Sequence, residues 1–118
     1  MTWNHTRGYL PMVASAQRFA ELHPTIEIVW EKRSLKAFEE CPVEQLAAEY
    51  DLIVLDHPFV GYAAEHGPLL PLDEHLAPGF LADQAANSVG ASHASYAFAG
   101  HQWALAIDAA APVAMWRE

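Results

Sequence analysis

The chain has 118 residues, 53% of them apolar and 18% charged, a composition typical of a globular protein and not of a disordered one. Its 15 acidic and 6 basic residues leave a formal net charge of −9, which argues against a nucleic-acid-binding surface. The single cysteine, Cys41, excludes an internal disulfide and a cysteine-based zinc site, and no apolar run reaches the ~18 residues that a membrane span requires.

Helix and strand patterns alternate through the first third of the chain. The opening, residues 2–9, is polar and aromatic, typical of a loop that follows a strand, and we expect most of that strand to be missing. Apolar residues three and four positions apart predict a helix over 9–23, with Pro11 in its first turn. Alternation of side-chain type over 25–33 predicts a strand that ends near Lys32.

The middle of the chain contains a strongly apolar run, Leu52 to Leu55, between a predicted helix over 42–50 and another over 59–66. A short apolar run bounded by polar and turn residues is typical of a strand that is buried on both faces. Ligands of open α/β sheets bind just beyond the carboxyl ends of such strands. Asp56 and His57, which follow the run directly, are therefore candidates for a functional site.

The last third is less regular. Two prolines, Pro71 and Pro78, interrupt residues 69–80 and predict an irregular connection, after which residues 78–89 contain a short helix and residues 91–96 a turn of helix. From Tyr96 the pattern predicts a hairpin that turns at Gly100 and His101 and continues as a strand over 103–107.

The order of these elements, with strands and helices in alternation, predicts a parallel sheet with right-handed crossovers. We therefore expect the α/β class, as an open three-layer α/β/α arrangement with a mostly parallel sheet. The apolar segment from Ala109 to Trp116 could supply a further strand.

Catalytic motifs are missing from the chain. Its seven histidines show no HExxH or HxH spacing, and GxSxG, GxGxxG and GxxxxGK[ST] do not occur. We expect neither a metal site nor a cofactor, and we do not expect an enzyme.

Aromatic and polar residues gather after the predicted strands instead. Carboxylates and amides hydrogen-bond to vicinal hydroxyls, and aromatic faces stack on the apolar face of a sugar ring. This combination favours a small polar ligand in a cleft. The candidate ligand-binding residues are Trp3, Asn4, His5, Arg33, Asp56, His57 and Asp108.

Two stretches, YDLIVLDHPFVGYAAEHGPLLPLDEHL (50–76) and YAFAGHQWALAIDAAAPVAMWR (96–117), resemble family 1 extracellular solute-binding proteins, the maltose-binding-protein-like receptors of ABC importers. They share with that family a strand ending in a polar pair, a helix and a connection of the form gLLxpLd. A later motif is matched at Tyr96, Gly100, Trp103, Ala104 and Ile107. Many members carry proline where Ala106 stands, and residues 2–34 resemble the family's first strand–helix–strand unit.

The resemblance implies that residues 1–118 form the amino-terminal lobe of a periplasmic-binding-protein-like type II fold, with the second lobe absent. Family members are longer and close two lobes around their ligand, so a single lobe should bind weakly. By position, the family's ligand contacts carry over to the seven candidates given above, and Asp108, after the predicted strand over 103–107, is the sharpest of them.

The implied partners are a sugar or polyol and the permease subunits of an ABC importer. The implied location is periplasmic or extracellular, although the sequence shows no signal peptide. The apolar carboxyl-terminal segment could promote self-association. The alternative is a cytoplasmic α/β enzyme or regulatory domain that uses Asp56, His57 and His5 at the sheet edge.

Overall fold

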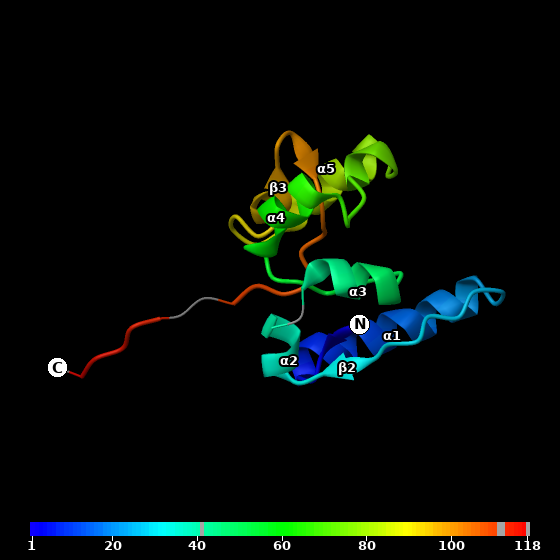
Figure 1. Cartoon of the computed structure of the whole chain (residues 1–118), viewed down its shortest axis with the longest axis horizontal. Helices are drawn as coiled ribbons and strands as arrows, with labels where there is room; N and C mark the ends of the chain where they lie inside the picture. Colours follow the sequence, from blue (N-terminus) through cyan, green and yellow to red (C-terminus); the bar gives the residue numbers. More distant parts are fainter. Residues whose placement is uncertain (41, 111–112, 118) are drawn as a thin grey trace. The chain divides into compact units, whose positions relative to one another are not determined.

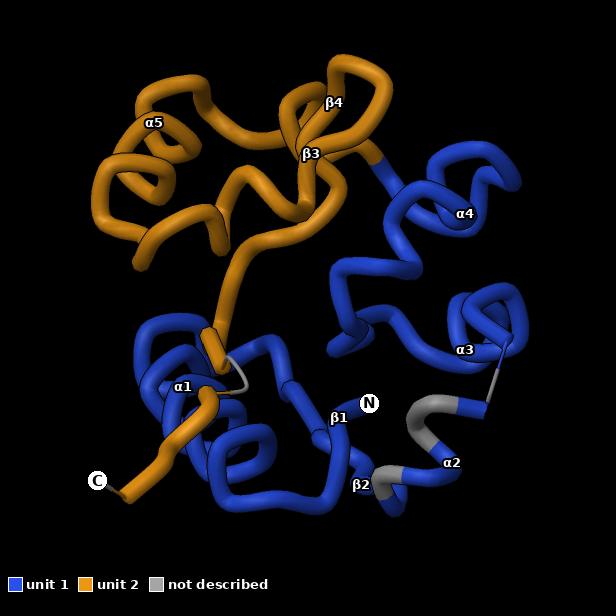
Figure 2. Tube along the Cα trace, turned by 90° about the vertical axis from the view of Figure 1, so that its left-hand side faces the viewer, with its two compact units in different colours: residues 1–70 blue, residues 71–118 orange. Residues whose placement is uncertain are grey.

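The computed structural model describes residues 1–40, 42–110 and 113–117, apart from the side chains of residues 35, 38 and 39. The chain divides into two compact units, unit 1 from Met1 to Leu70 and unit 2 from Pro71 to Glu118 (Figure 2). In the described residues, helices accompany one parallel and one antiparallel two-stranded sheet. The chain is therefore of mixed α/β class, as the sequence predicts.

Unit 1 begins with a parallel strand–helix–strand unit (Figure 1). Strand β1 (Thr2–Trp3) pairs in parallel with β2 (Lys32–Arg33), and helix α1 (Thr6–Leu22) connects them. The helix predicted over 9–23 is confirmed, but it begins earlier, and Pro11 lies inside it. The opening residues form a short strand followed by a cap, so the prediction of a loop there was wrong in part.

The strand predicted over 25–33 was too long, because only Lys32 and Arg33 lie in a ladder. The register sets Thr2 opposite Lys32, so residues 26–30 have no residue of β1 beside them. A strand requires the hydrogen bonds of a neighbour, and alternation of side chains alone does not supply them. Residues 26–31 nevertheless run on from α1 to β2 without forming a helix (Figure 1).

The run from Leu52 to Leu55 is not a ladder strand, and Leu52 is 52% exposed, so the expectation of a strand buried on both faces was wrong. The segment still lies beside β1: the Met1 amino group donates to the Leu52 carbonyl (2.7 Å), and the Val54 N–H donates to the Met1 carbonyl (3.0 Å). These two bonds have the pattern of a parallel pair centred on Met1 and Ile53. Ile53 and Val54 pack against the core and Leu52 does not, so the run is only partly buried.

The core of unit 1 forms around Met1 and Leu46, and Trp3, Tyr50, Ile53 and Val54 pack against them. Leu46 belongs to helix α3 (Val43–Glu49), which follows helix α2 (Leu35–Glu40), and Val43 of α3 is also buried.

Helix α4 (Phe59–His66) buries Val60 and Ala63 and ends at Gly67, whose φ of 74° lies in the left-handed region that glycine adopts without strain. The Tyr62 hydroxyl of α4 donates to Glu44 of α3. The helices predicted over 42–50 and 59–66 are thus confirmed.

Unit 2 consists of a 3-10 turn η1 (Leu72–Glu74), helix α5 (Pro78–Asn87), a second 3-10 turn η2 (Ala94–Tyr96) and a hairpin. The helix predicted within 78–89 and the helical turn predicted within 91–96 are confirmed. Proline at the first position of α5 fits its N-terminus, where no internal N–H bond is lost.

The predicted hairpin is present, but its turn and second strand were misplaced. Strands β3 (Ala97–Phe98) and β4 (His101–Gln102) enclose Ala99 and Gly100, whose φ angles of 51° and 87° fit a type I′ turn. The predicted turn at Gly100–His101 is therefore one residue late, because both central residues of this turn need positive φ. Residues 103–107 form no strand.

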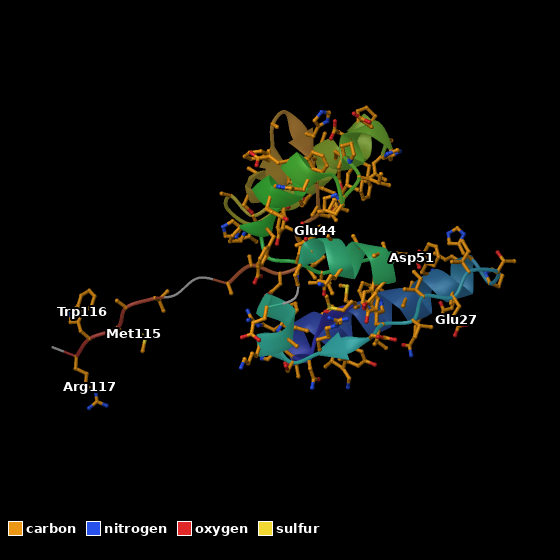
Figure 3. All side chains as sticks on the ribbon, viewed as in Figure 1. Glu27, Glu44, Asp51, Met115, Trp116 and Arg117 are labelled. Atoms are coloured by element: carbon orange, nitrogen blue, oxygen red, sulfur yellow. The ribbon has the colours of Figure 1, made fainter. Side chains whose placement is uncertain are left out.

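The carboxyl-terminal segment is exposed in the part that the structure describes. Residues 109–110 and 113–117 form no strand, contrary to the sequence prediction, and residues 111–112 lie outside the described chain. Met115, Trp116 and Arg117 all project from this segment (Figure 3). Among the described residues of this segment, the large apolar side chains of Val113, Met115 and Trp116 are exposed.

Candidate functional site

The carboxyl ends of β1 and β2 meet at one edge of the parallel sheet. The register pairs Trp3 with Arg33, and the Asn4 N–H donates to the Arg33 carbonyl at 2.7 Å. Asn4 and His5 follow β1 directly and are exposed, whereas Trp3 and Arg33 are partly buried. Four of the predicted site residues, Trp3, Asn4, His5 and Arg33, are therefore neighbours, as the strand-end argument expects.

Trp3 and His5 place two aromatic planes at this edge. Their rings lie within 9° of parallel, with centroids 6.3 Å apart. The Trp3 ring also covers Gly8, where a Cβ atom would overlap the indole, so the first turn of α1 needs glycine at this position. The indole is thus held between the core and α1.

His5 has a structural role that the sequence did not indicate. Its Nδ1 accepts the Arg7 N–H at 3.1 Å and caps α1. A neutral imidazole that accepts at Nδ1 carries its proton on Nε2. His5 can therefore offer an Nε2–H donor to a ligand while it caps the helix.

Arg33 is held by neighbours within unit 1. Its Nη2 donates to Glu49 Oε2 (3.0 Å) and to the Tyr50 hydroxyl (3.3 Å), and its guanidinium lies 5.4 Å from the centre of the Tyr50 ring. The Tyr50 hydroxyl in turn donates to Glu31 Oε2 at 2.7 Å. The Glu49 carboxylate reduces the attraction of this guanidinium for an anionic ligand, and Glu49 and Tyr50 together hold its position.

Asp56 and His57 lie between the 52–55 segment and α4. Their carbonyls accept the N–H groups of Phe59 and Val60, both at 3.1 Å, and their side chains are exposed. These bonds fix the backbone of Asp56 and His57, and the polar groups of both side chains remain at the surface.

Asp108, the seventh candidate, is an exposed residue of unit 2. It follows residues 103–107, which form no strand, so the strand-end argument that singled it out has lost its basis. The six other candidates all belong to unit 1.

A polar cluster in unit 2 was missed from the sequence. The Asp73 carboxylate of η1 accepts the Gln102 N–H at Oδ1 (2.8 Å) and pairs with His101 Nδ1 at Oδ2 (3.0 Å). The Gln102 amide donates to the carbonyls of His93 (3.0 Å) and Ala104 (2.7 Å). We call Asp73, His101 and Gln102 the hairpin clasp. His101 and Gln102 lie 28 and 29 residues after Asp73, a separation that no local sequence pattern indicates.

The electrostatics of the clasp favour the charged carboxylate. The Gln102 N–H, with a smaller contribution from the His101 imidazole, lowers the pKa of Asp73 below its ordinary value. Both Asp73 oxygens are engaged in holding η1 to β4, and the Trp103 indole donates to the Phe98 carbonyl at 3.0 Å across the same hairpin. The geometry suits a structural role in unit 2.

The described residues contain no group of three or more His, Cys, Asp or Glu side chains that could hold a metal ion. Among the helices that the structure describes, none combines the length and apolar character needed to cross a membrane. Cys41, the single cysteine, lies outside the described residues. Comparison with family models, with curated protein sequences and with solved structures finds no match to this chain.

Proposed function

We propose that this chain is the amino-terminal lobe of a solute-binding protein of an ABC importer, and that it binds a sugar or similar polyol and performs no chemistry. The observation that supports this best is the group of aromatic and polar residues where β1 and β2 end side by side. Polar groups at the carboxyl ends of adjacent parallel strands are the usual ligand position of open α/β sheets.

The order of the parallel segments supports the finer fold that this proposal needs. β2 lies on one side of β1, and residues 52–54 lie on the other side through the two bonds to Met1. Helical connections separate the three segments in sequence. An α/β sheet that starts with the first strand between the second and third is consistent with a three-layer α/β/α lobe of the type II fold.

The site chemistry favours an uncharged hydroxylated solute. The Asn4 amide and the Asp56 carboxylate can bind hydroxyl groups, and the exposed His5 offers an Nε2–H donor and a ring face. Glu49 and Tyr50 hold Arg33, which weakens the case for an anion. Binding by one lobe should be weak, because closure of a second lobe supplies opposing contacts and expels water.

In this role the lobe would work outside the cytoplasm, in the periplasm or at the cell exterior. Ligand-dependent closure against a second lobe would present it to permease subunits. Asp108 stays a candidate ligand contact on the resemblance alone.

Backbone amide NMR during titration with monosaccharides and disaccharides at millimolar concentration tests the proposal. We expect shifts at residues 3–5, Arg33 and residues 56–57, with Asp108 the one further position where a shift fits the proposal, and weaker binding in Asp56→Asn. Asp51→Asn is the matched control, since both aspartates are exposed and flank the same apolar run. Sugar-dependent shifts that map elsewhere, or equal losses in both variants, would contradict the assignment of this site.

The same amide spectra test the alternative, an Asp/His site that serves an enzyme or regulatory domain. Zn²⁺ and Mg²⁺ should leave the resonances of His5, Asp56 and His57 in place if the site binds polyols. Perturbation of these three residues by a divalent cation, with none from any polar solute, would favour the alternative.

A further inference from the structure

The segment that leads into β2 carries unused backbone hydrogen-bonding groups. Thr2 N–H donates to the Glu31 carbonyl and Asn4 N–H to the Arg33 carbonyl, so the odd-numbered residues direct their polar groups toward β1. Because these groups alternate along a strand, Lys32 directs its own to the opposite edge, as would Trp30 and Ile28 in a strand that continues back from β2. In the described chain, the backbone groups of Ile28 and Trp30 take no hydrogen-bond partner.

The residues that usually protect such an edge do not protect this one. Natural edge strands are commonly guarded by lysine, proline or a bulge. Here Lys32 extends over α1, where its Nζ lies 4.5 Å from the centre of the Tyr9 ring. Residues 26–31 contain no proline. The Val29 side chain is 74% exposed, and in a strand it would lie on the opposite face from the side chains of Ile28 and Trp30.

We propose that this edge pairs antiparallel with the same segment of a second copy of the chain, so that residues 26–33 of two copies join their sheets. Unpaired edge strands are templates for this kind of association. Two-fold symmetry makes the contact self-complementary and closes it as a dimer. Ile28, Trp30 and Lys32 supply the main-chain donors and acceptors for about six hydrogen bonds across the junction.

Charge distinguishes the registers centred on Val29, Trp30 and Glu31, and a register centred on Ile28 would need the Ile26 N–H, which already donates to the His23 carbonyl. With Trp30 opposite its own copy, Glu27 lies opposite Arg33 and Val29 lies opposite Glu31, so no like charges meet. A shift that places Val29 opposite itself sets Glu27 against Glu31. The opposite shift sets Glu31 against Glu31. Like charges directly opposite each other destabilise a strand pair, so we propose the register centred on Trp30. The Glu27 side chain projects outward from the segment (Figure 3).

Sedimentation equilibrium of the full chain tests this register with two charge variants. Val29→Glu would place a carboxylate opposite Glu31 twice in each dimer and should raise the dimer dissociation constant about tenfold. Val29→Lys would place an ammonium group there and should leave the dissociation constant unchanged or lower it. Both substitutions replace an exposed side chain, and circular dichroism checks that each variant is folded.

Val89→Glu and Val89→Lys are the matched controls, because Val89 is 76% exposed in unit 2 and gives the same two changes in net charge. Neither should alter association. A chain that stays monomeric up to millimolar concentration overturns the proposal, as do equal effects of the two Val29 variants or of the Val89 pair. Loss of the dimer in Trp116→Ser but not in Val29→Glu would assign association to the exposed carboxyl-terminal segment.

Discussion

Different interactions stabilise the inside of unit 1 and the inside of unit 2. Unit 1 buries apolar side chains, with Met1 and Leu46 at the centre and Val60 and Ala63 on the buried face of α4. In unit 2, none of the described residues is buried, and the hairpin clasp and the Trp103–Phe98 bond join its elements. Burial of apolar area is the larger source of stability, whereas exposed polar bonds exchange with water at little net gain.

This difference predicts different sensitivities. Unit 1 should respond to changes of side-chain volume, and unit 2 should respond to changes of charge and hydrogen bonding. The four predictions that follow test this contrast.

The largest effect should come from removing volume at the core of unit 1. Leu46 is 3% exposed, so Leu46→Ala should lower the free energy of unfolding by about 2–5 kcal/mol through lost burial and a cavity. Leu22→Ala is the control, because Leu22 is 59% exposed and should cost about 0.5 kcal/mol or less. Urea unfolding followed by circular dichroism measures both, and similar losses would mean that unit 1 has no specific core at Leu46.

Adding volume beneath Trp3 should come next. A Cβ atom at Gly8 would overlap the Trp3 ring, so Gly8→Ala should cost about 1–3 kcal/mol despite the better helix propensity of alanine. Gly79→Ala, in α5 of unit 2, meets nothing within 4 Å and should be neutral or slightly stabilising. Thermal unfolding compares the two, and stabilisation by Gly8→Ala would show that the indole moves freely.

The cap of α1 should have a smaller effect. His5→Ala removes the acceptor of the Arg7 N–H and should cost about 1 kcal/mol, whereas His5→Ser can restore the cap and most of this loss. Urea unfolding of the three proteins measures the difference. If His5→Ser is as unstable as His5→Ala, the imidazole contributes by its packing near Trp3 and not as a cap.

The smallest and most local effect should be in the hairpin clasp. The lowered pKa of Asp73 means that its charged form stabilises unit 2 above the ordinary aspartate pKa, and that this contribution is lost as the pH falls through the lowered value. Asp73→Asn should therefore reduce hydrogen-exchange protection of the Gln102 amide near neutral pH, and the difference from the unaltered chain should shrink in acid.

Glu74→Gln is the control for the clasp. Glu74 lies 3.8 Å from His101 Nδ1, beyond hydrogen-bond length, and the Gln102 N–H donates to Asp73. We expect little change in Gln102 protection. Equal loss of protection in Asp73→Asn and Glu74→Gln would indicate a diffuse effect of negative charge instead of a specific bond.

The candidate site was predictable only in part. Strand-end reasoning brought Trp3, Asn4, His5 and Arg33 to one edge, because the strand–helix–strand pattern already implies parallel pairing. It missed that His5 caps α1 and that Glu49 and Tyr50 hold Arg33, since these contacts depend on where α1 and α3 lie.

The sequence by itself determined most of the helices of this protein, although it did not indicate α2 (Leu35–Glu40). The ends of α4 and α5 follow from local signals, such as Gly67 after α4 and Pro78 at the start of α5, because a helix is stabilised by bonds between residues four apart. The strands depended on tertiary structure. An alternating or apolar run becomes a strand only where a partner lies beside it, and β1 pairs with two residues of the run that ends at Arg33. The Asp73–His101 pair was decided in the same way, by contacts between residues far apart in the chain.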